Sequence, residues 1–532
     1  MEGQKLEEQE GKNILMVEPA YSLLYDHTKL SPVTIKVDKY QVYDQVSKSL
    51  TNPLNNTQKI VFDHSFDNRV TLLWGPPGTG KTTTLASIVL GWIEFADSID
   101  FSLNIGIGSS NWTAINNLLE EIKEILDFRI NTLGPFSKKI EINRIRSSTG
   151  ERFKSVGIND IEVYSNAATA LKQRFEEKDN VFINGSTWKQ FYNLSKQVKG
   201  ANGSDKKWFD LFLIDEASQV KVEHASGYFL FLKDSFHLVL AGDDKQLGPI
   251  HGFQMEDNSN GLFDCIYTFM KDTHRVTPLA IVDNYRSNES INQWPNIRFY
   301  FGQLASKSPG KILNINLPQE KPEFWPSTLP WNDSYLKLLD PTTPVVIITY
   351  PSSVYTVSNP FEAQIVSALC YLFKHTLGND ISEEDFIKHK IGIVTPHRAQ
   401  RSQIKNLLLQ TDINLSSDAF VDTVDRFQGQ ERDLILSSYT VSDRDFVKSE
   451  EEFILDPRRF NVSLTRAKSK FIMFISDALV DYLPDDKKIA EDASHLQMFV
   501  LKYCNIEELM TIEYLDSEGN CKKIDCKFRT IS

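Results

Sequence analysis

Residues 75–82 have the types and the spacing of a loop that binds the phosphates of a nucleotide. They read Gly-Pro-Pro-Gly-Thr-Gly-Lys-Thr and match G-x-x-x-x-G-K-[ST] at every fixed position. Glycines let backbone N–H groups close around phosphate oxygens, and the N-terminus of a following helix adds positive potential. In this pattern Lys81 reaches the β- and γ-phosphates and Thr82 holds Mg²⁺. The residues expected to contact the nucleotide here are Gly75, Pro76, Gly78, Thr79, Gly80, Lys81, Thr82 and Thr83.

Two carboxylates, Asp215 and Glu216, follow an apolar run at residues 211–214. A buried strand would deliver them to the edge of a sheet, where Asp215 can hold Mg²⁺ and Glu216 can polarise the attacking water. The phosphate-binding loop earlier in the chain supports this interpretation of the two carboxylates. Gln246 follows the next apolar run and could contact the γ-phosphate there. The alternative is an ordinary Gly/Pro loop at residues 242–249.

The elements that position these residues alternate between apolar, strand-like runs and helical patterns. This alternation predicts an α/β fold in which parallel sheets are flanked by helices. One series of strands is expected at residues 70–74, 104–108, 181–183, 211–214 and 238–241, and a second at 345–349, 391–394, 419–423, 434–437 and 471–475. Two series in 532 residues indicate two domains. The expected organisation is an N-terminal extension (1–50), a first domain (51–275) with an inserted segment at about 130–178, a second domain (276–500) and a C-terminal tail (501–532).

The composition is that of an ordinary globular protein with a net negative charge. The chain has 58 basic and 71 acidic residues and a formal net charge of −13. This balance disfavours a histone-like nucleic-acid binder but leaves room for a groove lined with basic residues. No apolar run approaches the roughly 18 residues of a membrane span, and residues 1–12 resemble no signal or transit peptide. Five scattered cysteines favour reduced thiols, so we expect a cytoplasmic protein, or a nuclear one in a eukaryote, that is not secreted and has no membrane partner.

A basic stretch lies inside the first domain, at residues 138–154. Two interpretations are open for it: a solvated surface, or a contact with nucleic acid. The second predicts that replacing Arg144 and Arg146 with alanine weakens nucleic-acid binding about equally for all sequences, because such a contact would be made to phosphates.

The motifs and their order resemble superfamily 1 helicases of subgroup B, of the senataxin and nonsense-mediated-decay type. The resemblance runs from about residue 54 to about residue 475. It includes Asp-Glu-Ala-Ser-Gln at 215–219, Asn-Tyr-Arg-Ser at 284–287 and Asp-Arg-Phe-Gln-Gly-Gln-Glu at 425–431. The resemblance implies two tandem RecA-like domains of the P-loop NTPase kind, with a small insertion in the first, and the use of ATP with Mg²⁺.

The resemblance also implies roles for residues outside the phosphate-binding loop. Gln58 would read the edge of the adenine, and Tyr285 would stack on it. Gly429 would come close to a phosphate, and Glu431 would meet the ribose. The residues implied for catalysis are Lys81, Asp215, Glu216, Gln246, Arg286 and Arg466, the last as an arginine finger.

Loops that hold a single strand are implied by the same resemblance. His397 stands where the family usually carries tyrosine. The residues implied to contact nucleic acid are Ser110, Asn111, Thr187, Trp188, Pro396, His397 and Thr423.

The expected function is that of an ATP-dependent translocase or helicase stimulated by single-stranded DNA or RNA, which moves 5′ to 3′ as the resemblance to subgroup B implies. The alternative is a nucleotide switch, in which ATP binding gates a partner protein or senses nucleic-acid ends with little unwinding. A catalytically dead scaffold is disfavoured because the expected catalytic residues are all present. The sequence does not choose between DNA and RNA, since recognition of the 2′-OH depends on geometry.

Overall fold

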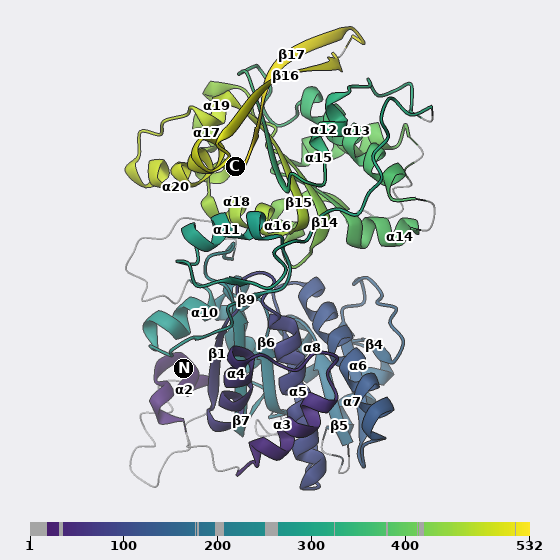
Figure 1. Cartoon of the computed structure of the whole chain (residues 1–532). Coiled ribbons are helices and arrows are strands. Elements are labelled where there is room, and N and C mark those ends of the chain that lie inside the picture. The colour runs from purple at the N-terminus through teal and green to yellow at the C-terminus, as the bar shows by residue number, and fades with distance from the viewer. Residues whose placement is uncertain are drawn as a thin grey trace. The chain divides into compact units, whose positions relative to one another are not determined.

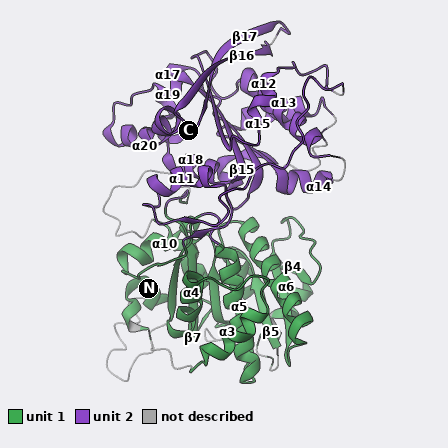
Figure 2. Cartoon of the chain, viewed as in Figure 1, with its two compact units in different colours: residues 1–76, 80–244, 248–281 green, residues 77–79, 245–247, 282–532 purple. Residues whose placement is uncertain are grey.

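The chain forms two compact units, drawn in different colours in Figure 2. Unit 1 comprises residues 1–76, 80–244 and 248–281, and unit 2 comprises residues 77–79, 245–247 and 282–532. The computed structural model describes residues 19–30, 36–175, 177, 180–196, 207–249, 264–323, 325–378, 381–411, 413, 420–516 and 518–532. None of the helices in this described part of the chain combines the length and the apolar character needed to cross a bilayer.

Unit 1 is built on an eight-stranded sheet in which every neighbouring pair is parallel, in the order β4-β3-β5-β2-β6-β7-β1-β8. The strands are β1 (Val70–Trp74), β2 (Leu103–Gly108), β3 (Lys139–Arg146), β4 (Ile158–Glu162), β5 (Asn180–Gly185), β6 (Phe209–Ile214), β7 (Leu232–Gly242) and β8 (Leu279–Ala280). Because all of them run the same way, their carboxyl ends meet at one edge of the sheet. Ligands of open parallel sheets bind at this edge.

Helices cover both faces of this sheet (Figure 1). They are α2 (Pro19–Tyr25), α3 (Lys39–Lys48), α4 (Asn56–Asp67), α5 (Lys81–Ser98), α6 (Trp112–Leu133), α7 (Asn166–Arg174), α8 (Trp188–Lys196), α9 (Val222–Phe229) and α10 (Ile266–Thr268), with short helical turns at η1 (His27–Lys29), η3 (Ala217–Gln219) and η4 (Phe269–Thr273). Successive side chains of a strand point to opposite faces. Leu73 therefore packs with α3 to α6, whereas Leu72 packs with α2 and α7 to α10. Burial on both faces explains the continuous apolar runs that predicted these strands.

Unit 2 is built on a seven-stranded sheet in the order β13-β12-β14-β15-β11-β17-β16. Its strands are β11 (Val345–Tyr350), β12 (Ile391–Thr395), β13 (Val421–Thr423), β14 (Arg432–Ser438), β15 (Ala467–Ser476), β16 (Ile506–Leu515) and β17 (Cys521–Thr530), and a separate small pair is formed by β9 (Asp283–Asn284) and β10 (Ala305–Ser306). The first five strands in this order are parallel, whereas β17 is antiparallel to both of its neighbours. Residue 419, the start of one predicted strand, lies outside the described residues.

Helices also cover both faces of the sheet of unit 2 (Figure 1). They are α11 (Glu289–Arg298), α12 (Ser334–Leu338), α13 (Pro360–Thr376), α14 (Glu383–Asp385), α15 (Arg398–Leu408), α16 (Val424–Phe427), α17 (Arg444–Ile454), α18 (Pro457–Thr465), α19 (Asp477–Val480) and α20 (Lys487–Met498), with helical turns at η5 (Phe386–Lys390) and η7 (Phe499–Tyr503). Ile348 of β11 packs with α12, α13, α15 and η5, and its neighbour Ile347 packs with α11 and α16 to α20.

The α/β class and the parallel sheets predicted from the sequence are confirmed, but two segments differ from the expected organisation. The segment expected as an insertion contributes β3 and β4 to the sheet of unit 1 itself. The segment expected as a C-terminal tail forms the hairpin β16–β17, which pairs with β11. Strands in both segments mix polar with apolar residues, so they lack the mainly apolar runs by which the other strands were recognised.

Candidate nucleotide-binding and nucleic-acid-binding sites

The phosphate-binding loop joins β1 to α5 at the carboxyl edge of the sheet of unit 1. Strand β1 ends at Trp74, and α5 begins at Lys81 directly after Gly80, whose φ of +79° lies in the left-handed region. Glycine adopts this conformation without steric cost. A Cβ at Gly80 would also lie 2.5 Å from Nε2 of Gln58. The strand, loop and helix expected from the sequence are therefore present, and glycine stands where the backbone and its neighbour require it.

Gln58 closes the first turn of α4. Its backbone N donates to Oδ1 of Asn55 at 2.9 Å, and its Oε1 accepts from N of Asn55 at 3.0 Å. This reciprocal cap satisfies two N–H groups at the start of the helix. It also holds the side chain against Gly80. The residue expected to read adenine therefore lies beside the phosphate-binding loop, and its contact with the base stays a prediction.

Two buried carboxylates face Lys81 at the end of β6. Nζ of Lys81 lies 3.0 Å from Oε1 of Glu216 and 3.9 Å from Oδ1 of Asp215. Burial alone would lower the pKa of Lys81, but the two carboxylates outweigh burial and the pKa is raised. Burial raises the pKa of Asp215; Lys81 opposes that shift and Glu216 adds to it. The structure thus brings three of the predicted catalytic residues into one cluster that is largely closed to water.

This donor set fits a Mg²⁺ ion bound together with a nucleotide. Asp215 and Glu216 are only 4% and 8% exposed, and buried carboxylates require a compensating cation. Thr82 and Asp215 are the residues that would hold the ion, through hydroxyl and carboxylate oxygens, and the ion would neutralise phosphate charge. Oγ1 of Thr83 donates to Oε1 of Glu121 at 2.8 Å and so joins α5 to α6. The contact of Thr83 with the nucleotide stays a prediction.

Gln219 links Glu216 to the loop that follows β2. Its Nε2 donates to Oε2 of Glu216, and its Oε1 accepts from Oγ of Ser110 and from Nδ2 of Asn111, each at 3.4 Å. Glu216 has a φ of +50°. This left-handed backbone costs a non-glycine residue about 1–3 kcal/mol. A strained residue is thus held by an amide that also contacts the loop expected to bind a strand. From the sequence alone, Gln219 had no role of its own beyond its place in the motif at residues 215–219.

Tyr228 of α9 ties the two expected strand-binding loops of unit 1 together. Its hydroxyl accepts from N of Ser109 at 3.2 Å and lies 3.0 and 3.2 Å from the carbonyl oxygens of Ser109 and Ser186. Oγ of Ser186 in turn donates to the carbonyl of Ile145 in β3 at 2.6 Å. The loops after β2 and β5 and the end of β3 therefore form one connected surface. A single tyrosine in a short helix carries no sequence signal of such a role.

The expected contacts within these two loops are placed as follows. Ser110 is exposed, whereas Asn111, Thr187 and Trp188 are partly exposed. Asn111 also caps α6, because its Oδ1 accepts from N of Ala114 at 2.8 Å. These side chains are accessible at the carboxyl edge of the sheet, and their contact with a strand stays a prediction.

In unit 2, residues expected at the nucleotide form an ion-pair cluster. Nε of Arg286 donates to Oε2 of Glu431 at 2.5 Å, and Nζ of Lys468 lies 2.9 Å from Oε1 of Glu431. The charge of Arg286, supported by Lys468, holds the pKa of Glu431 well below its usual range although burial opposes this. Tyr285 is 45% exposed, and its stacking on adenine stays a prediction. Gly429 has a φ of +83°, which favours glycine.

Arg466 is buried at the end of α18, with 2% of its surface exposed. Its Nε donates to the carbonyl of Val462 at 3.1 Å. Its Nη2 donates at 3.0 Å to Oε1 of Gln246, which belongs to the short segment 245–247 of the same unit. Two residues expected to respond to the γ-phosphate are thus hydrogen-bonded to each other. A guanidinium held in one orientation suits the arginine-finger role predicted for it.

His397 is buried, which contradicts its expected contact with a strand. Its side chain is 9% exposed, Nε2 lies 3.3 Å from Oε2 of Glu450, and the ring packs near Phe453 of α17. Burial lowers the pKa of His397 to about 4, so the ring is neutral at pH 7. A buried neutral ring offers a strand neither charge nor a stacking face. Pro396 and Thr423 are partly exposed, and their contacts stay predictions.

A buried carboxyl in α13 organises the interior behind this loop. Glu362 accepts hydrogen bonds from the hydroxyls of Tyr350 and Ser438 and, at 2.8 Å, from N of Thr440. Thr440 has a φ of +69°, so Glu362 holds a strained residue in place. Burial raises the pKa of Glu362 to about 7 although all three hydrogen bonds oppose the shift.

Gln400 extends this network to the loop that follows β12. Its Oε1 accepts from N of Asn359 at 2.7 Å, and its Nε2 donates to Oγ of Ser438 at 2.9 Å. Nδ2 of Asn359 donates to the hydroxyl of Tyr350 at 2.9 Å. The position of residues 395–400 is therefore set by buried polar groups that the motif pattern did not reveal.

The basic stretch predicted in unit 1 is corrected by the structure at its two arginines. Arg144 and Arg146 of β3 are 3% and 6% exposed, and both bind Asp160 of β4 at 2.7 Å. The guanidinium of Arg144 also lies 4.3 Å from the ring centre of Trp112. Both interpretations, a solvated surface and a strand contact, are wrong for these two residues. Their replacement would break buried ion pairs, so a loss of binding would report damage to the fold.

Known protein families match both halves of the chain. Two family models, each described as an AAA domain, match residues 57–252 and residues 262–478. The first match contains Lys81 and Glu216, and the second contains Arg286, Glu431 and Arg466. The two matches thus include the clusters just described in both units.

Curated relatives of this chain are named as helicases. The chain is 26% identical to the DNA polymerase alpha-associated DNA helicase A of Saccharomyces cerevisiae over 505 residues, which cover 83% of this chain and 69% of that protein. It is 27% identical to the DNA replication ATP-dependent helicase/nuclease DNA2 of Homo sapiens over 446 residues, covering 80% and 37%. It is 26% identical over 486 residues, covering 81% and 40%, to ECM32 of Saccharomyces cerevisiae, which is provisionally named an ATP-dependent RNA helicase.

The match thus spans less than half the length of two of these relatives. Among solved structures, the DUF1998 helicase MrfA bound to DNA aligns with a TM-score of 0.42 and 10% identity over 90% of this chain and 56% of that one, too distant a likeness to compare sites. The two AAA-domain matches and the helicase relatives agree with the motif order. The chain is therefore similar to superfamily 1 helicases, in agreement with the resemblance to the senataxin and nonsense-mediated-decay type that its motifs carry.

Proposed function

We propose that this protein uses ATP hydrolysis to move along single-stranded nucleic acid, as a translocase or helicase. The observation that carries the proposal is the link through Gln219. This residue bonds both to Glu216, the predicted base, and to Ser110 and Asn111, the predicted strand contacts. A strand that displaces either contact changes the support of Glu216, which provides a route from strand binding to ATP hydrolysis. The similarity to curated helicases supports the same proposal.

In the proposed reaction Glu216 accepts a proton from the water that attacks the γ-phosphate. In the structure Glu216 is paired with Lys81 at 3.0 Å, and a carboxylate engaged by an ammonium group is less available to a proton. Phosphates of a bound nucleotide compete for Lys81 and so release Glu216. Arg286 and Arg466 complete the proposed set by neutralising charge that develops on the phosphates. The proposed 5′ to 3′ direction rests on the subgroup resemblance.

A nucleotide switch with little unwinding is the second candidate. The burial of His397 favours it, because one of the strand contacts expected in unit 2 is not available. In such a switch the ATP site would bind and hydrolyse ATP as described. The outcome would be a change in the affinity of this protein for a partner protein.

Stimulation of the ATPase by nucleic acid tests the proposal. The full chain is assayed with single-stranded DNA, single-stranded RNA and duplexes that carry either a 5′ or a 3′ single-stranded tail. We expect stimulation by single strands and displacement from the 5′-tailed duplex. Displacement from the 3′-tailed duplex alone would overturn the direction, and stimulation without displacement from either would favour the switch. ATP turnover that no nucleic acid stimulates would refute the proposal.

Replacing Gln219 with leucine is expected to reduce this stimulation more than it reduces basal turnover. Leucine keeps the approximate volume but removes the hydrogen bonds that join Glu216 to Ser110 and Asn111. The loss of one hydrogen bond worth about 0.5–1.5 kcal/mol corresponds to roughly a two- to twelvefold loss of stimulation. The measurement is kcat without a strand and at a saturating strand concentration.

Gln190→Leu is the matched control for that variant. Gln190 is 8% exposed in α8, and its Oε1 accepts from Asn193 at 3.2 Å without contacting Glu216. An equal ratio of stimulated to basal kcat in wild type and Gln219→Leu would show that the link does not transmit strand binding.

A further inference from the structure

The carboxyl edge of the sheet of unit 1 continues past the expected strand-binding loops. Strand β3 lies next to β5, and β4 lies next to β3. Neighbouring strands are about 4.8 Å apart, so the ends of β3 and β4 lie about 5 and 10 Å beyond the end of β5. Ser186, which follows β5, bonds directly to Ile145 in β3. A strand held at the loops after β2 and β5 can therefore extend over these two further strand ends.

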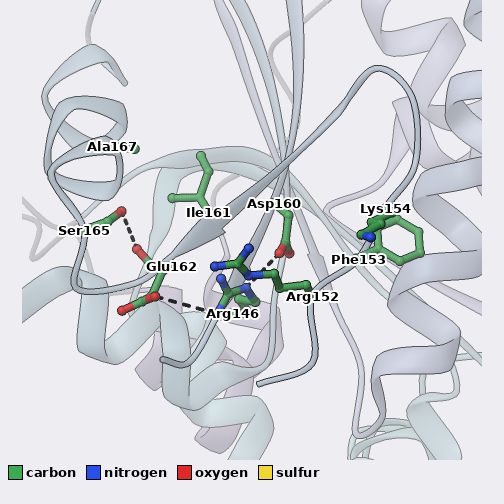
Figure 3. Close-up of a pocket in the computed structure, with 9 residues that line it drawn as sticks. All are labelled: Arg146, Arg152, Phe153, Lys154, Asp160, Ile161, Glu162, Ser165 and Ala167. Atoms are coloured by element: carbon green, nitrogen blue, oxygen red, sulfur yellow. Dashed lines mark hydrogen bonds and ion pairs between the residues drawn. The ribbon is translucent and has the colours of Figure 1, made fainter. Parts of the chain in front are cut away.

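A pocket of about 420 Å³ opens at these ends, between β3, β4 and the loop that joins them (Figure 3). Its charged lining consists of the cations Arg146, Arg152 and Lys154 and the carboxylates Asp160 and Glu162. Its position on the carboxyl edge is the one at which parallel sheets bind ligands.

Both carboxylates of the pocket are engaged by arginines of β3. Asp160 is shared by Arg144 and Arg146. Oε2 of Glu162 lies 3.8 Å from Nη1 of Arg146, and Figure 3 shows this pair. Arg152 and Lys154 are exposed, and neither forms a hydrogen bond or an ion pair with any residue in the described part of the chain. The charge left available to a ligand is therefore positive, in a protein whose net charge is −13.

Phe153 fixes the loop that carries these two cations. It is half-buried, and its ring centre lies 5.3 Å from the guanidinium of Arg144. Arg144 is itself anchored by Asp160 and by Oδ1 of Asn116, at 2.8 Å from its Nε. Arg152 and Lys154, on either side of Phe153, are thus held at the pocket by a buried anchor. A binding group positioned in advance loses less conformational entropy when its ligand arrives.

We propose that this pocket binds a backbone phosphate of the single strand through Arg152 and Lys154. The inference rests on the proposed function and adds a contact that neither the motifs nor the corrected arginines supply. Arginine and lysine are the side chains that hold phosphate oxygens, arginine through two parallel N–H bonds and lysine as a point charge. The contact lengthens the binding surface and is insensitive to base sequence.

The test compares the full-length variant R152A/K154A with wild type and with the control K487A/K488A. Lys487 and Lys488 are exposed at the start of α20 in unit 2, so the control removes the same charge elsewhere. Dissociation constants are measured for strands of about 6 and about 20 nucleotides at several salt concentrations. Thermal unfolding and basal ATP turnover should be unchanged in both variants, because all four residues are exposed and lie outside the ATP site.

We expect R152A/K154A to bind the long strand roughly five- to tenfold more weakly, with little change for the short one. The slope of log K against log salt should fall by about 0.7 for each phosphate that the variant no longer neutralises. Equal affinity of R152A/K154A and wild type for the long strand would overturn the inference, as would an equal loss on the short strand or in the control. Saturable binding of inorganic phosphate that the variant loses, with strand affinity intact, would also overturn it and assign the pocket to free phosphate. A wild-type protein that binds no strand at all would refute the proposed function itself, and the pocket inference with it.

Discussion

Glu216→Gln should lower ATP turnover by about 10²–10⁴-fold while ATP still binds. Glutamine keeps the shape of the side chain and an oxygen for the bond from Gln219, but it cannot accept the proton of the attacking water. The change also removes the negative charge 3.0 Å from Lys81, which leaves that ammonium group free for phosphates. ATP affinity should therefore stay the same or rise. The measurements are kcat from phosphate release and the dissociation constant of ATP by equilibrium binding.

Two further variants distinguish a loss of catalysis from a loss of ATP binding and from a general effect of removing a negative charge. Lys81→Ala should lose ATP binding as well as turnover, because the buried Asp215 and Glu216 lose the cation beside them and repel phosphate. Glu223→Gln changes a carboxylate of α9 whose side chain is 63% exposed, and it should turn over ATP like wild type. Wild-type turnover in Glu216→Gln would disprove the assignment of the base.

Glu362→Ala should destabilise unit 2 strongly, by about 3 kcal/mol or more, because it leaves three buried donors without an acceptor. These donors are the hydroxyls of Tyr350 and Ser438 and the N–H of Thr440. Glu362→Gln keeps the size of the side chain and an amide oxygen that can accept hydrogen bonds, so it should be far milder. The free energy of unfolding from urea titration is the measurement, and equal stability of the alanine variant and wild type would contradict the role of Glu362.

The same residue should give stability a recognisable dependence on pH. The pKa of Glu362 is about 7 in the folded protein against an ordinary value of 4.5, so the folded state binds the proton more tightly. Its contribution to stability is complete below about pH 4.5 and is lost as pH rises through 7, with a total of about 3 kcal/mol. Glu362→Gln has no proton to lose. The difference in unfolding free energy between wild type and Glu362→Gln should therefore fall over this window and stay level above it, and a level difference throughout would show an unshifted pKa.

The parts of the structure predicted well from the sequence are those set by local pattern. The strand before Lys81 and the strand before Asp215 are mainly apolar, and the motifs fix where the loops begin. Contacts between residues far apart in the sequence produce no such local pattern. Arg144 was expected to be exposed, in solvent or at a nucleic-acid strand, because its ion-pair partner Asp160 lies on another strand of the sheet. His397 was expected to be accessible because a sequence motif does not indicate whether a residue is buried. Buried polar contacts such as those of Tyr228 depend on three segments that meet only in the folded chain.

The order of strands in the sheet of unit 1 has a consequence for how the protein folds. Among the described residues, strand β1 pairs with β7 and β8, so Val70 finds its partner Leu238 far along the chain. As the chain emerges from the ribosome N-terminus first, the phosphate-binding loop is made early but has no sheet beneath it until β7 follows. Pairing at this separation slows folding, because a long loop must close before the contact forms. ATP can stabilise unit 1 only once β1 has docked, so nucleotide affinity during refolding should report completion of this sheet and not its beginning.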